Sequence, residues 1–127
     1  MDKIQLMPLR IPKGFAVCYN KFYDIEPIKS EKCDNLIENW DYFTQDILQI
    51  IKMDLRKGVW YIPKEHLIID LGWYPDSCPD GMYGLELSVV REDHSWDIIE
   101  QKESRDRFEI RDTIERWLNE NSGVKKT

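Results

Sequence analysis

The sequence predicts an α+β fold, with two amphipathic helices packed on one face of an antiparallel sheet of about four strands. Apolar residues recur at three- and four-residue steps in two stretches, 35–57 and 105–121, which is the spacing of one helix face. Alternating or β-branched apolar segments make up much of the remaining chain. Short links join the later segments, and strands joined in this way tend to pair as an antiparallel meander. Helices that are apolar on one stripe only pack on one face of such a sheet.

Length and composition predict one globular domain over residues 1–127. Hydrophobic residues make up 42% of the 127-residue chain and aromatic residues 12%, which is enough for a core. The formal net charge is −6 without a long block of like charges, so the acidity is spread over a folded surface. A negative surface repels phosphate backbones, which argues against direct nucleic-acid binding and favours a basic protein partner.

Cysteine usage and the N-terminal sequence favour a cytoplasmic protein. Cys18, Cys33 and Cys78 are widely spaced, which suits neither a disulfide framework nor a metal knuckle and indicates a reducing compartment. The first residues lack the apolar core and cleavage site of a signal peptide. The apolar runs are only a few residues long, so we expect no membrane-spanning segment.

Four segments are predicted as strands. Residues 14–24 carry apolar side chains at alternate positions, the period of a half-buried strand. The other three predicted strands follow one another in the second half of the chain, at 67–71, 85–91 and 96–102. The first of these three reads Leu-Ile-Ile-Asp-Leu, and its β-branched residues favour a buried strand.

Two segments are predicted as helices. The longer, residues 35–57, begins with a capping-box pattern and ends before Gly58, a residue type that favours the position after a helix C-terminus. Its apolar stripe consists of Trp40, Phe43, Ile47, Leu48, Ile50, Ile51 and Leu55. The shorter, residues 105–121, has Ser104 and Asp106 as candidate N-caps. Its apolar stripe consists of Ile110, Ile114, Trp117 and Leu118.

The stretch 67–90 contains the candidate binding residues. Between its two predicted strands lies a loop, residues 72–84, which contains two prolines and three glycines as well as aromatic and acidic residues. Aromatic side chains with polar tips are frequent interface anchors, and carboxylates can pair with Lys or Arg of a partner. The predicted contact surface consists of Asp70, Trp73, Tyr74, Asp76, Asp80 and Tyr83. The alternative is that Trp73 and Tyr74 fold back to fill the core, as aromatic residues commonly do, which would make the chain a structural adaptor domain.

A second alternative is a metal-dependent nuclease. Pro79-Asp80 followed by Glu100-Gln101-Lys102 has the residue order of the PD-(D/E)xK nucleases. In that chemistry Asp80 and Glu100 would hold a divalent cation, and Lys102 would position or activate water. The same order arises easily by chance in a chain that is 33% charged, and the acidic net charge does not suit a nucleic-acid substrate.

No other motif predicts a metal or cofactor. Residues 76–81 read Asp-Ser-Cys-Pro-Asp-Gly, which resembles part of a calcium-binding loop. The match fails because Cys78 replaces an oxygen ligand and Leu87 replaces the bidentate Glu. Phosphate-cradling glycine motifs and nucleophile elbows are also absent from the sequence. We therefore expect a protein without a cofactor.

The chain resembles the small cytosolic immunity proteins of bacterial toxin–immunity systems, including contact-dependent inhibition. The resemblance lies in size, acidity, α+β layout and the second half, which reads WYIPKEHLIIDLGWYPDSCPDGMYGLELSVV and then WDIIEQKESRDRFEIRDTIERWL. It implies a non-enzymatic protein that binds a cognate toxin domain, often a nuclease, and blocks its active site. An acidic surface would suit a basic, nucleic-acid-binding toxin by imitating phosphate charge.

Overall fold

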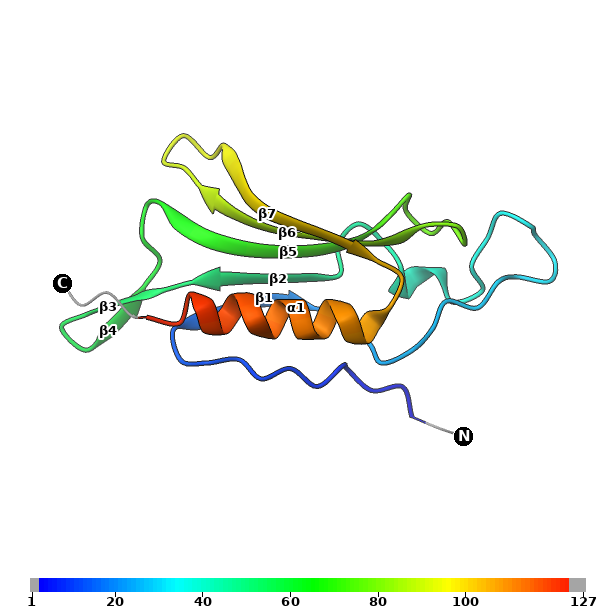
Figure 1. Cartoon of the computed structure of the whole chain (residues 1–127), viewed down its shortest axis with the longest axis horizontal. Coiled ribbons are helices and arrows are strands. Elements are labelled where there is room, and N and C mark those ends of the chain that lie inside the picture. Colours follow the sequence, from blue (N-terminus) through cyan, green and yellow to red (C-terminus); the bar gives the residue numbers. More distant parts are fainter. Residues whose placement is uncertain (1–2, 124–127) are drawn as a thin grey trace.

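The computed structural model describes residues 3–123, which form seven strands, one 3-10 turn and one α-helix (Figure 1). The elements are β1 (Phe15–Asn20), η1 (Trp40–Tyr42), β2 (Leu48–Lys52), β3 (Asp54–Arg56), β4 (Val59–Tyr61), β5 (His66–Tyr74), β6 (Met82–Val90), β7 (Trp96–Ser104) and α1 (Arg107–Glu120). Five strands pair antiparallel in the order β1-β2-β5-β6-β7, and β3 pairs with β4 in a separate hairpin.

The fold class predicted from the sequence, with two helices on a sheet of about four strands, is wrong. Within residues 3–123 the chain is mostly sheet, and α1 is its only α-helix. The predicted helix over residues 35–57 is replaced by a loop, the short turn η1 and the strands β2 and β3. Each of the four predicted strands overlaps a strand of the five-stranded sheet, and the predicted helix 105–121 overlaps α1.

The position of β2 explains why its segment resembles a helix in sequence. β2 pairs with β1 on one side and β5 on the other, so it lies inside the sheet. Leu48 and Ile50 belong to the core that includes α1, whereas Ile51 packs with Ile68 and Val90 in a separate cluster. A strand buried on both faces is a nearly continuous apolar run, which periodicity does not distinguish from a buried helix.

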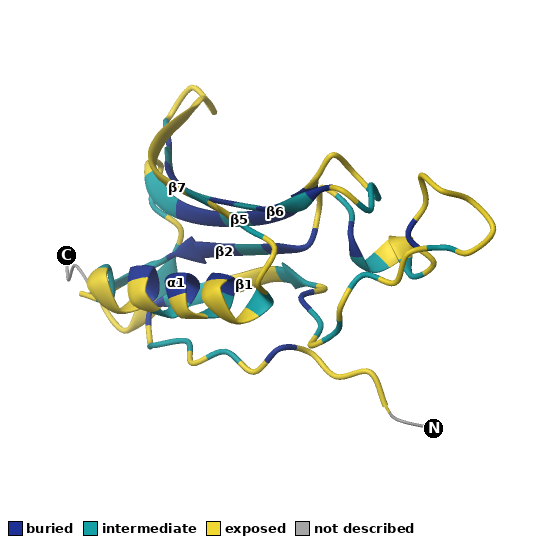
Figure 2. Cartoon of the chain, turned by 45° about the vertical axis from the view of Figure 1, so that its right-hand side comes forward, coloured by how far each residue is buried: buried dark blue, intermediate teal, exposed yellow. Residues whose placement is uncertain are grey.

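One face of the sheet carries the main core. α1 lies against this face, and its buried stripe points toward the sheet (Figure 2). The side chain of Asp106 accepts a hydrogen bond from the backbone N–H of Phe108, so Asp106 is the N-cap. The N-terminal segment runs alongside α1, where the backbone N–H of Arg10 donates to Glu115 at 2.9 Å (Figure 1).

We call the opposite face of the five-stranded sheet the open face, because no helix of the described chain covers it. Strand side chains alternate between faces, and the pairing register assigns each residue to one side. By this register the open face consists of Ala16, Tyr19, Gln49, Ile51, His66, Ile68, Asp70, Gly72, Tyr74, Met82, Gly84, Glu86, Ser88, Val90, Trp96, Ile98, Gln101 and Glu103.

Hydrogen exchange can distinguish β2 from a helix. We expect slow exchange over Leu48–Lys52, because β2 pairs with strands on both sides. The segment 38–46, which is largely exposed and contains only the short turn η1, should exchange fast and interrupt the protection. A helix over residues 35–57 would protect its amides as one continuous block, so uninterrupted protection across that block, measured by NMR or mass spectrometry, would contradict the fold.

Candidate functional site

A row of polar side chains, which we call the polar row, crosses the open face from one edge to the other. The register aligns Tyr19, Gln49, Asp70, Glu86 and Gln101, one from each of the five strands. The side-chain amide of Gln101 donates to Glu86 Oε1 at 3.3 Å. The neighbouring side chains of Gln49 and Tyr19 act to lower the pKa of Asp70, against the larger effect of burial.

Asp70 and Glu86 place two carboxylates directly opposite each other at the centre of this row. Like charges at directly opposed positions of an antiparallel pair are destabilising. Burial raises the pKa of Asp70 from its ordinary value of 3.8 to about 6, and the charges of Glu86 and Asp46 contribute to this rise. The open face contains no Lys or Arg that could compensate. At neutral pH the pair therefore carries a repulsion that no cation on its own face relieves.

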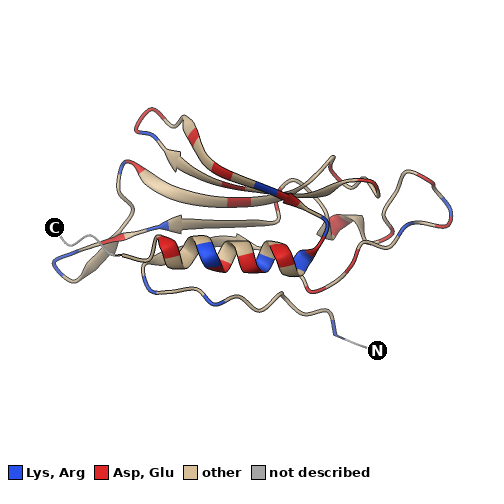
Figure 3. Ribbon diagram, in the orientation of Figure 1, with Lys and Arg blue, Asp and Glu red and all other residues tan. Residues whose placement is uncertain are grey.

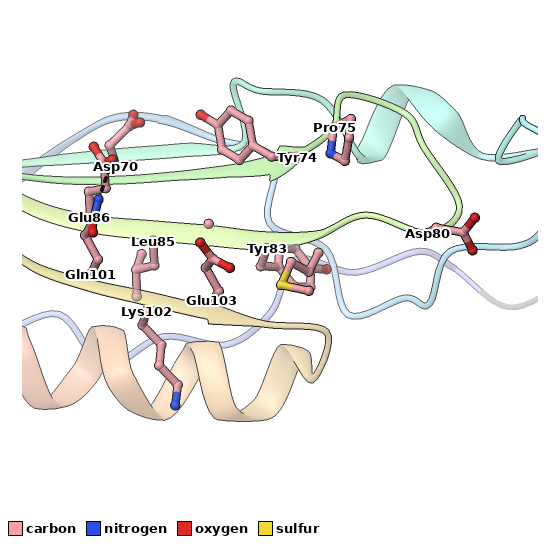
Figure 4. A pocket seen from close by; sticks show the side chains of 12 residues that line it. Asp70, Tyr74, Pro75, Asp80, Tyr83, Leu85, Glu86, Gln101, Lys102 and Glu103 are labelled. Carbon is pink, nitrogen blue, oxygen red and sulfur yellow. Dashed lines mark hydrogen bonds between the residues drawn. The ribbon is translucent and has the colours of Figure 1, made fainter.

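A groove of about 580 Å³ lies next to the polar row. It is lined by the central carboxylates, by Tyr74 and by the polar side chains of β7 (Figure 4). Its lining residues are Asp70, Tyr74, Pro75, Asp80, Met82, Tyr83, Gly84, Leu85, Glu86, Gln101, Lys102 and Glu103. The groove thus offers an aromatic ring and several carboxylates to a ligand at one place.

Tyr74 owes its position to two glycines that face each other across β5 and β6. Gly72 pairs with Gly84, and a Cβ on Gly84 would lie 2.9 Å from Tyr74 Cδ2. A Cβ on Gly72 would lie 2.7 Å from the Tyr74 hydroxyl oxygen. The ring therefore lies over the glycine pair, with its hydroxyl on the side of Asp70 (Figure 4). A larger residue at Gly84 would meet this ring, and one at Gly72 would meet both the ring and the backbone carbonyl of Gln45.

Two of the six residues predicted to contact a partner are buried. Trp73 is 0% exposed and Tyr83 belongs to the same main core. Their rings meet edge to face with centroids 5.0 Å apart. The indole N–H of Trp73 donates to the backbone carbonyl of Cys78 at 2.8 Å, which anchors the loop between β5 and β6. Filling of the core, the alternative considered for Trp73 and Tyr74, therefore describes Trp73 but not Tyr74.

The other four predicted residues are at least partly accessible. Asp70 and Tyr74 line the groove, and Tyr74 is 42% exposed. Asp76 is exposed and accepts a hydrogen bond from the backbone N–H of Gln45 at 3.0 Å, which holds the loop against the segment before β2. Asp80 is exposed and lies toward the loop end of the groove, away from Asp70 (Figure 4).

Sequence reasoning missed the residues that complete the groove. Glu86 alternates with the core residues Leu85 and Leu87, so its position on the other face was available from the sequence. Its placement opposite Asp70 requires the register between β5 and β6, which local patterns do not provide. Gln101 and Glu103 face the groove because of the register between β6 and β7, which local patterns likewise do not provide.

The three residues of the nuclease alternative point to different places. Lys102 extends toward α1, where its Nζ lies 3.5 Å from Glu109 Oε1, while Asp80 lies in the distant loop (Figure 4). Glu100 pairs with Leu87 rather than with an open-face residue. Among residues 3–123, no group of three or more His, Cys, Asp or Glu side chains is placed to hold a metal ion.

The charges of the two faces differ (Figure 3). α1 carries side chains of both signs along its length. In contrast, Asp70 is the only Asp, Glu, Lys or Arg in β5, and Glu86 the only one in β6. The centre of the open face is therefore uniformly acidic.

Comparison of the chain with protein-family models, curated proteins and solved structures gives no match. Over residues 3–123, no helix has both the length and the apolar character needed to cross a membrane. The open face and its groove are the features from which we derive a function.

The raised pKa of Asp70 predicts how the stability of the folded protein depends on pH. Because its folded pKa of about 6 lies above the ordinary 3.8, the folded state binds the proton more tightly, and stability falls as pH rises from about 4 through 6. Asp70→Asn removes this cost. We expect Asp70→Asn to be more stable than the wild type at pH 7.5, by on the order of 1 kcal/mol after allowance for solvent screening.

Urea unfolding at pH 4, 5.5 and 7.5 measures this difference, which should shrink toward zero at pH 4. Asp80→Asn is the matched control, because that carboxylate is exposed and should change stability little at any of these pH values. A wild type that gains stability relative to Asp70→Asn between pH 4 and 7.5 would refute the assignment.

Proposed function

We propose that this protein is a non-enzymatic inhibitor that binds a basic toxin domain, as the small bacterial immunity proteins do. The observation that supports this proposal is the Asp70–Glu86 pair on the uncovered face of the sheet. The pair costs stability in the isolated protein, and a cation from a partner would relieve that cost. A locally unfavourable arrangement on an accessible surface is typical of functional sites.

The chemistry of the groove suits an Arg or Lys side chain of the partner. A guanidinium between Asp70 and Glu86 could form charge-assisted hydrogen bonds with both carboxylates. The ring of Tyr74 lies beside them, where it could contact the cation through its face. The net charge of −6 would speed the encounter with a basic partner.

The proposal includes a cytoplasmic location and a toxin partner rather than nucleic acid or membrane. An acidic face that occupies the nucleic-acid-binding surface of a toxin would block its substrate by charge imitation. Neither alternative function has comparable support. Lys102 is paired with Glu109 rather than with Asp80, and a purely structural domain gains nothing from the Asp70–Glu86 repulsion.

Removal of the two central charges tests the proposal. The double variant Asp70→Asn/Glu86→Gln keeps the shape of both side chains, and we expect it to bind the product of the neighbouring gene on the order of 100-fold more weakly, because loss of interfacial charge pairs costs roughly 2–5 kcal/mol. Titration calorimetry at two salt concentrations measures the effect, and protection of cells that express the neighbouring product should fall in parallel.

Asp112→Asn/Glu120→Gln is the matched control, because it removes two carboxylates from α1, outside the open face. This control should bind like the wild type. Equal loss in both double variants would show that only the net charge matters. A wild-type protein that neither binds the neighbouring product nor protects against it would refute the proposed function.

A further inference from the structure

An apolar patch adjoins the polar row on the open face. It consists of the buried residues Ile51, Ile68 and Val90 together with Trp96 and Ile98 of β7. Trp96 is 42% exposed and Ile98 is 52% exposed. The register pairs Trp96 with Val90 and Ile98 with Ser88, so both exposed side chains belong to the open face.

This patch has the composition of an interface anchor rather than of an ordinary surface. Single exposed apolar residues are common, but Trp96 and Ile98 lie side by side on an edge strand and extend a buried apolar cluster. Tryptophan is enriched among the residues that dominate binding energy. The open face therefore combines an apolar contact point with an acidic one.

We propose that the occupant of the open face is a basic amphipathic segment of the partner protein. Its Lys or Arg enters the groove at Asp70 and Glu86, and its apolar side chain covers Trp96 and Ile98. This inference rests on the proposed function and adds the chemistry of the partner segment to it. Val90 lies four positions after Glu86 in β6, which corresponds to about 13 Å along the strand. A helical segment spans that distance with roughly nine residues.

A second copy of this chain fits the face less well. If two open faces met with their polar rows aligned, Asp70 and Glu86 of both copies would oppose each other. In the reversed orientation each polar row would lie on the other copy's apolar patch, where its carboxylates would lose hydration without gaining a partner. Edge-to-edge pairing of β7 would bring together two strands with three acidic residues and one Lys each. Charge complementarity therefore selects a basic partner.

The test uses the full chain and the purified product of the neighbouring gene. We expect Trp96→Ala and, separately, Ile98→Ser to weaken binding at least 10-fold, mainly through faster dissociation and with an unchanged salt dependence, because they remove apolar contacts. Asp70→Asn/Glu86→Gln should instead reduce the salt dependence. Val59→Ser is the matched control, since Val59 is exposed but lies in the separate β3–β4 hairpin. Urea unfolding confirms that each variant is folded.

The outcomes separate this inference from the proposed function. Wild-type affinity in both Trp96→Ala and Ile98→Ser, together with weak binding of the double carboxylate variant, would overturn the inference and leave the proposed function standing. No binding by the wild type would overturn both. If the isolated chain sediments as a dimer that Trp96→Ala dissociates, the occupant of the patch is a second copy, and the inference is wrong.

Discussion

The main core lies on one face of the sheet, and both α1 and the irregular segments pack there. α1 contributes Ile114 and Trp117 to the main core, and the irregular segments contribute residues such as Met7, Phe22 and Phe43 to the same core. No helix of the described chain covers the other face, where the backbone of Gln45 lies close to Gly72. On that face, the small apolar cluster around Ile68 and the Tyr74 ring over its glycine pair shield part of the sheet from solvent. The groove lies on the part of the face that remains exposed.

The distribution of charge follows the same division. Several cations of the chain are paired away from the open face: Arg107 with Asp24 and Glu26, Lys102 with Glu109, and Arg91 with Glu65 and Asp97. Asp70 and Glu86 have no such partner on their own face. If this surface served stability alone, we would expect a Lys opposite one of these two carboxylates. This uncompensated pair is the physical basis of the binding role that we propose.

Local sequence patterns predicted α1 and part of β1, β5, β6 and β7, but neither β2 nor the β3–β4 hairpin. The β5–β6 hairpin and α1 with its Asp106 cap follow from alternation, helical spacing and capping. The strand β2 was not predicted, because its partners are distant in sequence and its burial on both faces removes the alternation of apolar and polar residues. The candidate site was predictable only in part. Trp73 and Tyr74 are neighbours in sequence, but the strand places one in the core and the other in the groove. Only the register brings Glu86 opposite Asp70.

NMR mapping can show whether the open face binds a basic partner. The isotope-labelled full chain would be titrated with the unlabelled product of the neighbouring gene. We expect the largest shift changes along β5, β6 and β7, including the side-chain amides of Gln49 and Gln101, which lie in the polar row. Changes confined to α1 and the N-terminal segment, with the open face unaffected, would contradict the proposal.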